Sequence, residues 1–480
     1  MDPSFLPAWR LAELTRSGEI GCLELLDHFV ARTERLDARL NAVVVKDIER
    51  ARQRARALDQ GRRAEGGPLF GVPMTVKESF DIAGLPTTRG HADQRDHRAG
   101  QDALAVERLV RAGAVVFGKT NVPVDLADWQ SYNPLYGATN NPWDAAHTPG
   151  GSSGGSAAAC AAGFGGLELG SDIGGSIRVP AHYCGLFGHK PTWNLVPLRG
   201  TAPSDTGAVT DIAVSGPLAR SARDLAVAMD VLAGPDADET GLTVTLPPPR
   251  TTRLADMRFA VWADEPGQPT DPATVALLGQ LADHLAQQGA TVSRTARPAF
   301  DPAEAVRLYL TLLDCAWSGR LTEERMAERR AARARLSPDD ASADAVMLRA
   351  VDLSHRDWLK LNERRLVIRR AWSAFFRDWD VLLCPVIATP ALPHMQQGAT
   401  WERRITIDGR TIAYNDMLFW PGLTCGFHLP ASVAPLGLSQ GGLPIGVQIA
   451  GPIGGDRTTI AAAAALEASW RAFTPPPGFA

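Results

Sequence analysis

The 480-residue sequence has no excess of basic residues, because 49 Lys and Arg stand against 53 Asp and Glu, a formal net charge of −4. Without a basic surface the chain lacks the field that attracts a nucleic-acid backbone, so we expect no nucleic-acid partner. The N-terminus also lacks an apolar segment, and no run of 18 uncharged apolar residues occurs. We therefore expect no secretion signal and no membrane partner, and we predict a cytoplasmic protein.

Paired cysteine motifs are absent as well. The six cysteines lie far apart, with no C-x-x-C pair and no histidine at ligand spacing. This pattern excludes the common zinc and redox motifs, so we expect no metal and no cofactor. Cys160 and Cys384 stand in apolar or small-residue runs, which is typical of small buried hydrophobic residues in a reducing compartment.

Glycine and proline are abundant instead. The 45 Gly and 35 Pro make up about 17% of the chain, against roughly 12% in ordinary proteins. From Gly67 onward they separate short apolar runs from amphipathic helical segments, and this alternation predicts an α/β fold with a large mixed β-sheet covered by helices on both faces.

We expect four segments within one domain. They are an N-terminal helical layer (1–65), a Gly/Ser-rich core (66–235), a second α/β portion with a helical insertion and pocket walls (236–395), and C-terminal strands with a helix (396–480). The charged stretch 321–345 within the third segment is interpreted as a solvated face, and we assign it no function.

Two Gly/Ser strings, 148–156 (TPGGSSGGS) and 169–178 (LGSDIGGSIR), flank an Ala-rich helical stretch. A flexible linker is disfavoured because ordered segments surround both strings. A phosphate loop would need Gly-Lys-Ser/Thr, which is missing. Residues 150–154 fit the G-x-S-x-G elbow of α/β-hydrolases, yet loop-forming residues precede them where that motif needs a strand, so this stays the second interpretation.

Both strings, together with 71–78 (GVPMTVKE), 185–192 (GLFGHKPT) and 442–448 (GLPIGVQ), resemble the amidase signature family of Ser-Ser-Lys hydrolases. The similar motifs occur in the family's order and span most of the chain. The resemblance implies an enzyme that hydrolyses a small linear carboxamide, with an aryl or apolar acyl group, to a carboxylate and ammonia or an amine. It implies a small-molecule amide as the partner of a monomer or homodimer, without cofactor.

The resemblance implies that Ser176 is the nucleophile, Ser152 the bridging serine and Lys77 the base, with a cis peptide bond between Gly151 and Ser152. A lysine can accept a proton only when it is neutral, so burial away from carboxylates must lower its pKa from about 10.4. Glu78 is adjacent in sequence, but on a strand its side chain would point to the opposite face.

The run before the nucleophile supplies backbone N–H groups without bulky side chains, which is what an oxyanion hole requires. We assign this hole to Ile173, Gly174, Gly175 and Ser176. Three residues are expected to form a supporting network: Ser153, Asp172 and Arg178. For the last two, an ion pair that holds the turn is favoured over contact with substrate.

The residues of the substrate pocket are proposed only from the resemblance and from their position near loops, and core packing is the alternative for each. The candidates are Trp129, Tyr132, Cys315, Trp317, Trp420, Cys425 and His428.

Other functions stay open. A glutamyl-tRNA amidotransferase A-like subunit would act with a partner and tRNA, but Val124 and Val179 stand where such subunits commonly carry an acidic residue and Gln. A carbamate or cyclic-amide hydrolase of the same family and an inactive scaffold of the same fold are further alternatives.

Overall fold

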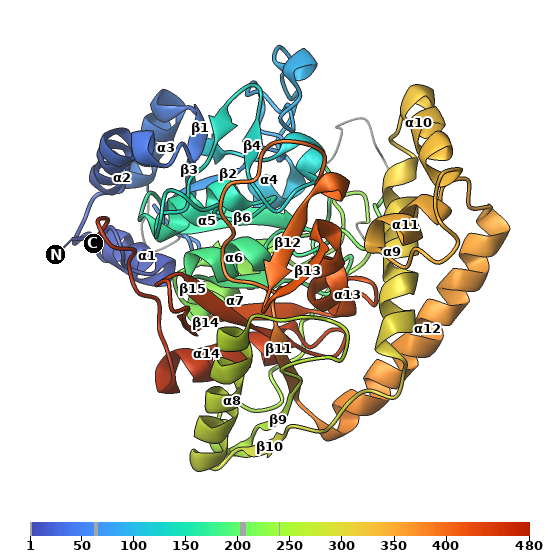
Figure 1. Ribbon diagram of the computed structural model, residues 1–480. Coiled ribbons are helices and arrows are strands. Elements are labelled where there is room, and N and C mark those ends of the chain that lie inside the picture. The colour runs from blue at the N-terminus through green and yellow to red at the C-terminus, as the bar shows by residue number, and fades with distance from the viewer. Residues whose placement is uncertain (1, 62–65, 202–207, 240) are drawn as a thin grey trace.

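The fold is built around one mixed β-sheet (Figure 1), and the computed structural model describes residues 2–61, 66–201, 208–239 and 241–480. Within these ranges the sheet has eleven strands. Their order is β1 (Val43–Lys46), β3 (Val115–Thr120), β2 (Pro73–Lys77), β6 (Leu167–Asp172), β8 (Val214–Ala219), β7 (Phe187–Lys190), β14 (Ala431–Leu438), β15 (Pro444–Ala450), β11 (Val381–Pro385), β9 (Arg258–Val261) and β10 (Thr291–Ser293). Parallel pairs such as β2–β6 and antiparallel pairs such as β6–β8 occur together, which confirms the predicted fold class.

The sheet takes strands from each of the four expected segments. Strand β1 corrects the prediction that residues 1–65 are wholly helical, since Val43–Lys46 pairs antiparallel with β3 at the edge of the sheet. This run of three valines is short and lies between two helices. Its β-branched residues favour an extended backbone, but four residues give too little periodicity to recognise.

Helices cover both faces of the sheet. One face carries α1 (Ala8–Ser17), α4 (Leu104–Arg111), α7 (Ala222–Leu232), α8 (Pro272–Gln287) and α14 (Asp456–Ser469). The opposite face carries α5 (Gly154–Ala161), α6 (Arg178–Cys184), α9 (Pro302–Ser318), α12 (His355–Asp378) and α13 (Phe419–Cys425). Helices α2 (Cys22–Leu36) and α3 (Ile48–Gln60) pack beside β3.

Strand β11 shows why both faces are covered. Val381 and Leu383 belong to one hydrophobic cluster, and Leu382 and Cys384 belong to the other. Successive side chains of a strand point to opposite faces, so a continuous apolar run is expected where both faces are buried.

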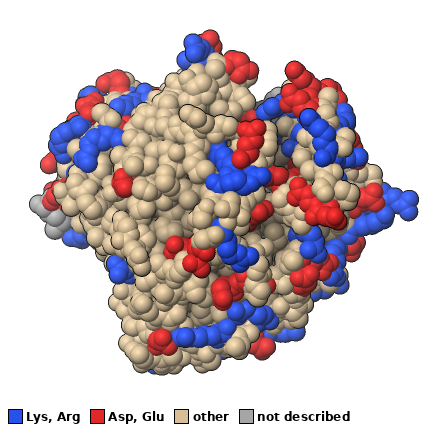
Figure 2. Space-filling model, viewed as in Figure 1, with Lys and Arg blue, Asp and Glu red and all other residues tan. Residues whose placement is uncertain are grey.

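The charged segment 321–345 divides into two parts with different surroundings. Helix α10 (Glu323–Arg333) has no buried residue and lies far from the sheet, in a region where Figure 2 shows acidic and basic side chains on the surface. Helix α11 (Ala343–Arg349) instead packs against α9. Over the described ranges no helix is long and apolar enough to cross a membrane.

Candidate active site

The site lies where neighbouring strands and two Gly/Ser loops meet. Strands β2 and β6 run parallel, with Val76 beside Leu169, so the ends of both strands reach the same edge of the sheet. Lys77 closes β2, and the loops before α5 and α6 carry Ser152 and Ser176. The topology thus brings together side chains that are 75 and 24 residues apart in sequence.

Lys77 is fully buried between two hydroxyl groups. Its Nζ lies 2.7 Å from Ser152 Oγ and 2.9 Å from Ser171 Oγ. Burial lowers the pKa of Lys77 to about 7, and the negative charge of Asp172 opposes that shift. Glu78 faces elsewhere, since its carboxylate accepts hydrogen bonds from the backbone of Thr88 and Arg89. Lys77 forms no ion pair within the described ranges.

Ser152 follows a cis peptide bond from Gly151, as predicted. A side chain at Gly151 would lie 2.3 Å from the carbonyl oxygen of Asp128, so only glycine fits here. Among the described residues no strand leads directly into this loop, because residues 139–153 are turns and irregular backbone. The α/β-hydrolase elbow interpretation is therefore wrong, since that motif joins a strand to a helix.

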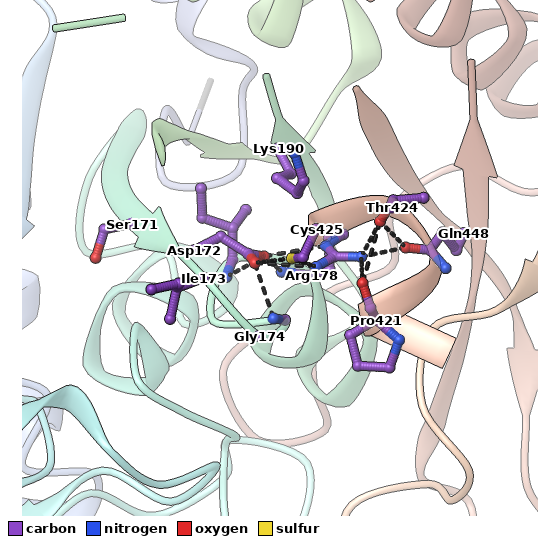
Figure 3. Close-up of polar contacts among 12 residues, drawn as sticks. Ser171, Asp172, Ile173, Gly174, Arg178, Lys190, Pro421, Thr424, Cys425 and Gln448 are labelled. Atoms are coloured by element: carbon purple, nitrogen blue, oxygen red, sulfur yellow. Dashed lines mark hydrogen bonds and ion pairs between the residues drawn. The ribbon is translucent and has the colours of Figure 1, made fainter. Parts of the chain in front are cut away.

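An ion pair between Asp172 and Arg178 holds the loop before α6 (Figure 3). Both side chains are fully buried, with 3.0 Å between Arg178 Nη2 and Asp172 Oδ1. Burial alone would raise the pKa of Asp172, but the guanidinium outweighs it and keeps this pKa well below its usual range. Arg178 also donates to Thr424 Oγ1 at 2.7 Å and to the carbonyl oxygen of Pro421 at 3.2 Å. These contacts agree with the favoured interpretation of a structural pair. Ser153 is similarly engaged, since its N–H donates to the carbonyl oxygen of Ser176 at 3.1 Å.

The backbone N–H groups near Ser176 are not equivalent. The N–H of Gly175 donates to Asp172 Oδ1 at 2.8 Å, so this group is unavailable to a substrate oxygen, which corrects the expected set of four donors. The N–H groups of Ile173, Gly174 and Ser176 have no acceptor in the part of the chain that the structure describes.

Two buried side chains fix the orientation of these peptide groups. The hydroxyl of Tyr309, on α9, donates to the carbonyl oxygen of Ile173 at 3.1 Å, and the indole N–H of Trp129 donates to that of Gly174 at 3.0 Å. In a trans peptide the C=O and the following N–H point in opposite directions. Tyr309 therefore turns the N–H of Gly174 away from α9. No motif in the sequence pointed to Tyr309, because α9 lies in the stretch with little resemblance to the family.

Ser176 lies where two cavities meet. The first, of about 170 Å³, is lined by Ser152, Ser171 and Ser176, and we call it the Ser152 cavity. The second, of about 230 Å³, is lined by Ser176, Gly174 and Trp129, and we call it the Trp129 cavity. In the described ranges no group of three His, Cys, Asp or Glu side chains could hold a metal ion.

The structure places only two of the expected pocket residues in the walls of these cavities. Trp317 lines both, and Trp129 lines the second. Tyr132 lines neither, because its hydroxyl accepts a hydrogen bond from Arg403, and Cys315 on α9 also lines neither.

Three further pocket predictions are corrected by burial in other surroundings. Trp420 packs in the hydrophobic core, and Cys425 lies with its Sγ against Arg178. His428 stacks on Trp193, with 4.4 Å between ring centroids, and does not reach either cavity.

Sequence reasoning missed most of the walls of the Trp129 cavity. These walls include Leu313, Leu321, Met347, Trp401, Tyr414 and Leu418. Segment 321–345, to which no function was assigned, contributes Leu321, Arg329 and Asp344. Leucine, methionine and tryptophan are also the ordinary residues of a core, so composition could not single them out.

Comparison with known proteins agrees with this geometry. The amidase family model matches residues 24–460. The indoleacetamide hydrolase of Bradyrhizobium diazoefficiens is 33% identical, over 96% of this chain and 87% of the relative. One component of the glutamyl-tRNA(Gln) amidotransferase of Synechococcus sp. (strain CC9605) is 32% identical, over 93% of this chain and 92% of the relative. The crystal structure of a bacterial aryl acylamidase belonging to the amidase signature enzymes superposes with a TM-score of 0.80 at 26% identity, covering 97% of this chain and 96% of that chain.

Proposed function

The chain belongs to the amidase family, hydrolases that act on carbon–nitrogen amide bonds, and on this premise we propose that it cleaves a small linear carboxamide through an acyl-Ser176 intermediate. One observation carries the proposal. Lys77 Nζ lies 2.7 Å from Ser152 Oγ, and Ser152 shares a cavity wall with Ser176. A buried amine beside a hydroxyl is the arrangement that activates a serine without histidine.

The proposed proton path runs through Ser152. Ser176 Oγ attacks the amide carbon and gives its proton to Ser152, whose own proton passes to the neutral Nζ of Lys77. When the C–N bond breaks, Ser152 donates a proton to the leaving nitrogen and recovers one from Lys77. Water then attacks the acyl-Ser176 ester, with the same two residues as the base.

The oxyanion of the tetrahedral intermediate would lie against the N–H groups of Gly174 and Ser176, with Ile173 as a further donor. Their freedom from other acceptors in the described ranges supports this role. Donors that are already oriented lower the barrier because they need not reorganise as charge develops.

The acyl group of the substrate is proposed to be small and aromatic. The Trp129 cavity has Trp129, Trp317, Trp401 and Tyr414 in its walls, which favours a flat apolar group. The similar proteins named as an indoleacetamide hydrolase and an aryl acylamidase are consistent with such a substrate.

The test is hydrolysis of phenylacetamide by the pure protein, without any partner. We expect release of phenylacetate and ammonia, and Ser176→Ala should lower kcat by at least about 10³-fold. Ser153→Ala is the matched control, since that neighbouring serine has no place in the proton path. Full activity of a folded Ser176→Ala protein would refute the nucleophile, whereas activity that requires a partner protein would favour the amidotransferase alternative.

A further inference from the structure

Two arginines line the Ser152 cavity, Arg89 and Arg320. We propose that this cavity binds the amine half of the substrate and that both guanidiniums bind a carboxylate carried by that amine. The substrates would then be N-acyl amino acids and similar amides of short amino carboxylates. The inference rests on the proposed function and extends it to the leaving group.

The position of Ser152 decides which half of the substrate occupies which cavity. Ser152 lines the first cavity and not the second, whereas Gly174 lines the second and not the first. The group that returns a proton to the leaving nitrogen must lie within hydrogen-bond reach of it. The amine therefore leaves on the Ser152 side, and the acyl group occupies the Trp129 cavity.

The charges on the amine side are not balanced. Arg89 pairs with Asp125, and that carboxylate also lies 2.7 Å from His91 Nε2. Asp172, the other acidic residue of this wall, is paired with Arg178. Arg320 has no ion pair in the described ranges and donates to the hydroxyl of Thr210. One guanidinium beside the serines thus lacks a counter-charge.

The two arginines also lie close enough to repel each other. Burial lowers the pKa of Arg320, and the positive charge of Arg89 lowers it further, against the opposing charge of Asp125. A carboxylate bound between two guanidiniums would relieve this repulsion and accept paired hydrogen bonds.

The Trp129 cavity has the opposite balance. Its charged wall residues are Asp128, Asp314, Asp344 and Arg329. A carboxylate on the acyl half would meet this excess of negative charge, whereas a carboxylate on the amine half would meet the arginines. The charges of the two cavities therefore favour a single orientation of the substrate.

The experiment compares matched amides of phenylacetic acid. N-phenylacetyl derivatives of glycine, β-alanine and γ-aminobutyrate carry the carboxylate at increasing distance, and the N-propyl, N-butyl and N-pentyl amides are their neutral counterparts. We expect kcat/KM for the best carboxylate substrate to exceed that of its counterpart by about tenfold or more. The ratio should shrink as NaCl rises from about 0.05 to 0.5 M, because salt screens exposed charges.

Arg320→Gln should lower kcat/KM about tenfold more for the carboxylate substrate than for the neutral one, and Arg320→Lys should retain part of the preference. Arg307→Gln is the control, since this exposed arginine of α9 lines neither cavity. Equal kcat/KM within the wild-type pairs, or an equal loss for both substrates in Arg320→Gln, would overturn the inference. So would hydrolysis of phenylacetamide with no cleavage of the carboxylate amides, although that outcome leaves the proposed function standing. Only the Ser176→Ala comparison refutes the function itself.

Discussion

The rate of amide hydrolysis should depend on pH through Lys77. The buried amine has a pKa of about 7 in place of 10.5, a difference that corresponds to about 5 kcal/mol against the charged form. At pH 8 about 90% of such a lysine is neutral, against less than about 1% of an unperturbed one. Because the base must be neutral, we expect kcat/KM to be half-maximal near pH 7, constant above about pH 8, and about 100-fold lower at pH 5.

The assay measures phenylacetate release from phenylacetamide, which does not titrate between about pH 5 and 10. Glu168→Gln is the matched control, because burial raises the pKa of this nearby acid to about 8 and its titration could imitate that of Lys77. The variant should keep the wild-type profile. A profile that is flat from about pH 6 to 9, or one that reaches half its maximum near pH 10.5, would refute a buried neutral lysine as the base.

Three further predictions concern stability and orientation. Lys77→Met should be inactive yet roughly 2–3 kcal/mol more stable at pH 8 by urea unfolding: since the folded pKa lies below the unfolded one, unfolding takes up a proton between about pH 7 and 10.5, and the gain should vanish as pH approaches 10.5. Tyr309→Phe should lower kcat about tenfold with little change in KM, because the ring still packs while the carbonyl of Ile173 loses its donor; a change in KM alone would contradict this. Asp172→Asn should cost about 3–5 kcal/mol in unfolding experiments, because Arg178 would keep a buried charge without its partner, and a loss below about 1 kcal/mol would contradict the importance of the pair.

Most of the reactive groups could be predicted from the sequence because each lies in a short continuous motif. Glycines that admit tight backbone approach must be contiguous with the serines they accompany, as at Gly151, and a buried strand that carries Lys77 is itself a recognisable apolar run. The cis bond before Ser152 and the pair between Asp172 and Arg178 followed from the same motifs.

The cavity walls could not be predicted in this way. They come from α9, from α11 and from the 400–418 stretch, where each wall residue is far in sequence from the next. His428 shows the corresponding error. A polar residue that interrupts an apolar segment suggested a pocket, yet its Nε2 lies 2.9 Å from Asp211 in a buried network. Burial of a polar side chain requires a partner, and a sequence does not show whether that partner is substrate or protein.

The pair between Asp172 and Arg178 shows that the choice between a structural and a functional role was too narrow. Asp172 is the acidic group whose charge raises the pKa of Lys77, against the larger effect of burial. Arg178 holds both carboxylate oxygens of Asp172 at 3.0 Å, which directs that negative charge toward the guanidinium and away from the amine. The same carboxylate withdraws the N–H of Gly175 and leaves those of Gly174 and Ser176 for the substrate. An interaction that never touches the substrate thus keeps the base neutral and selects the oxyanion donors.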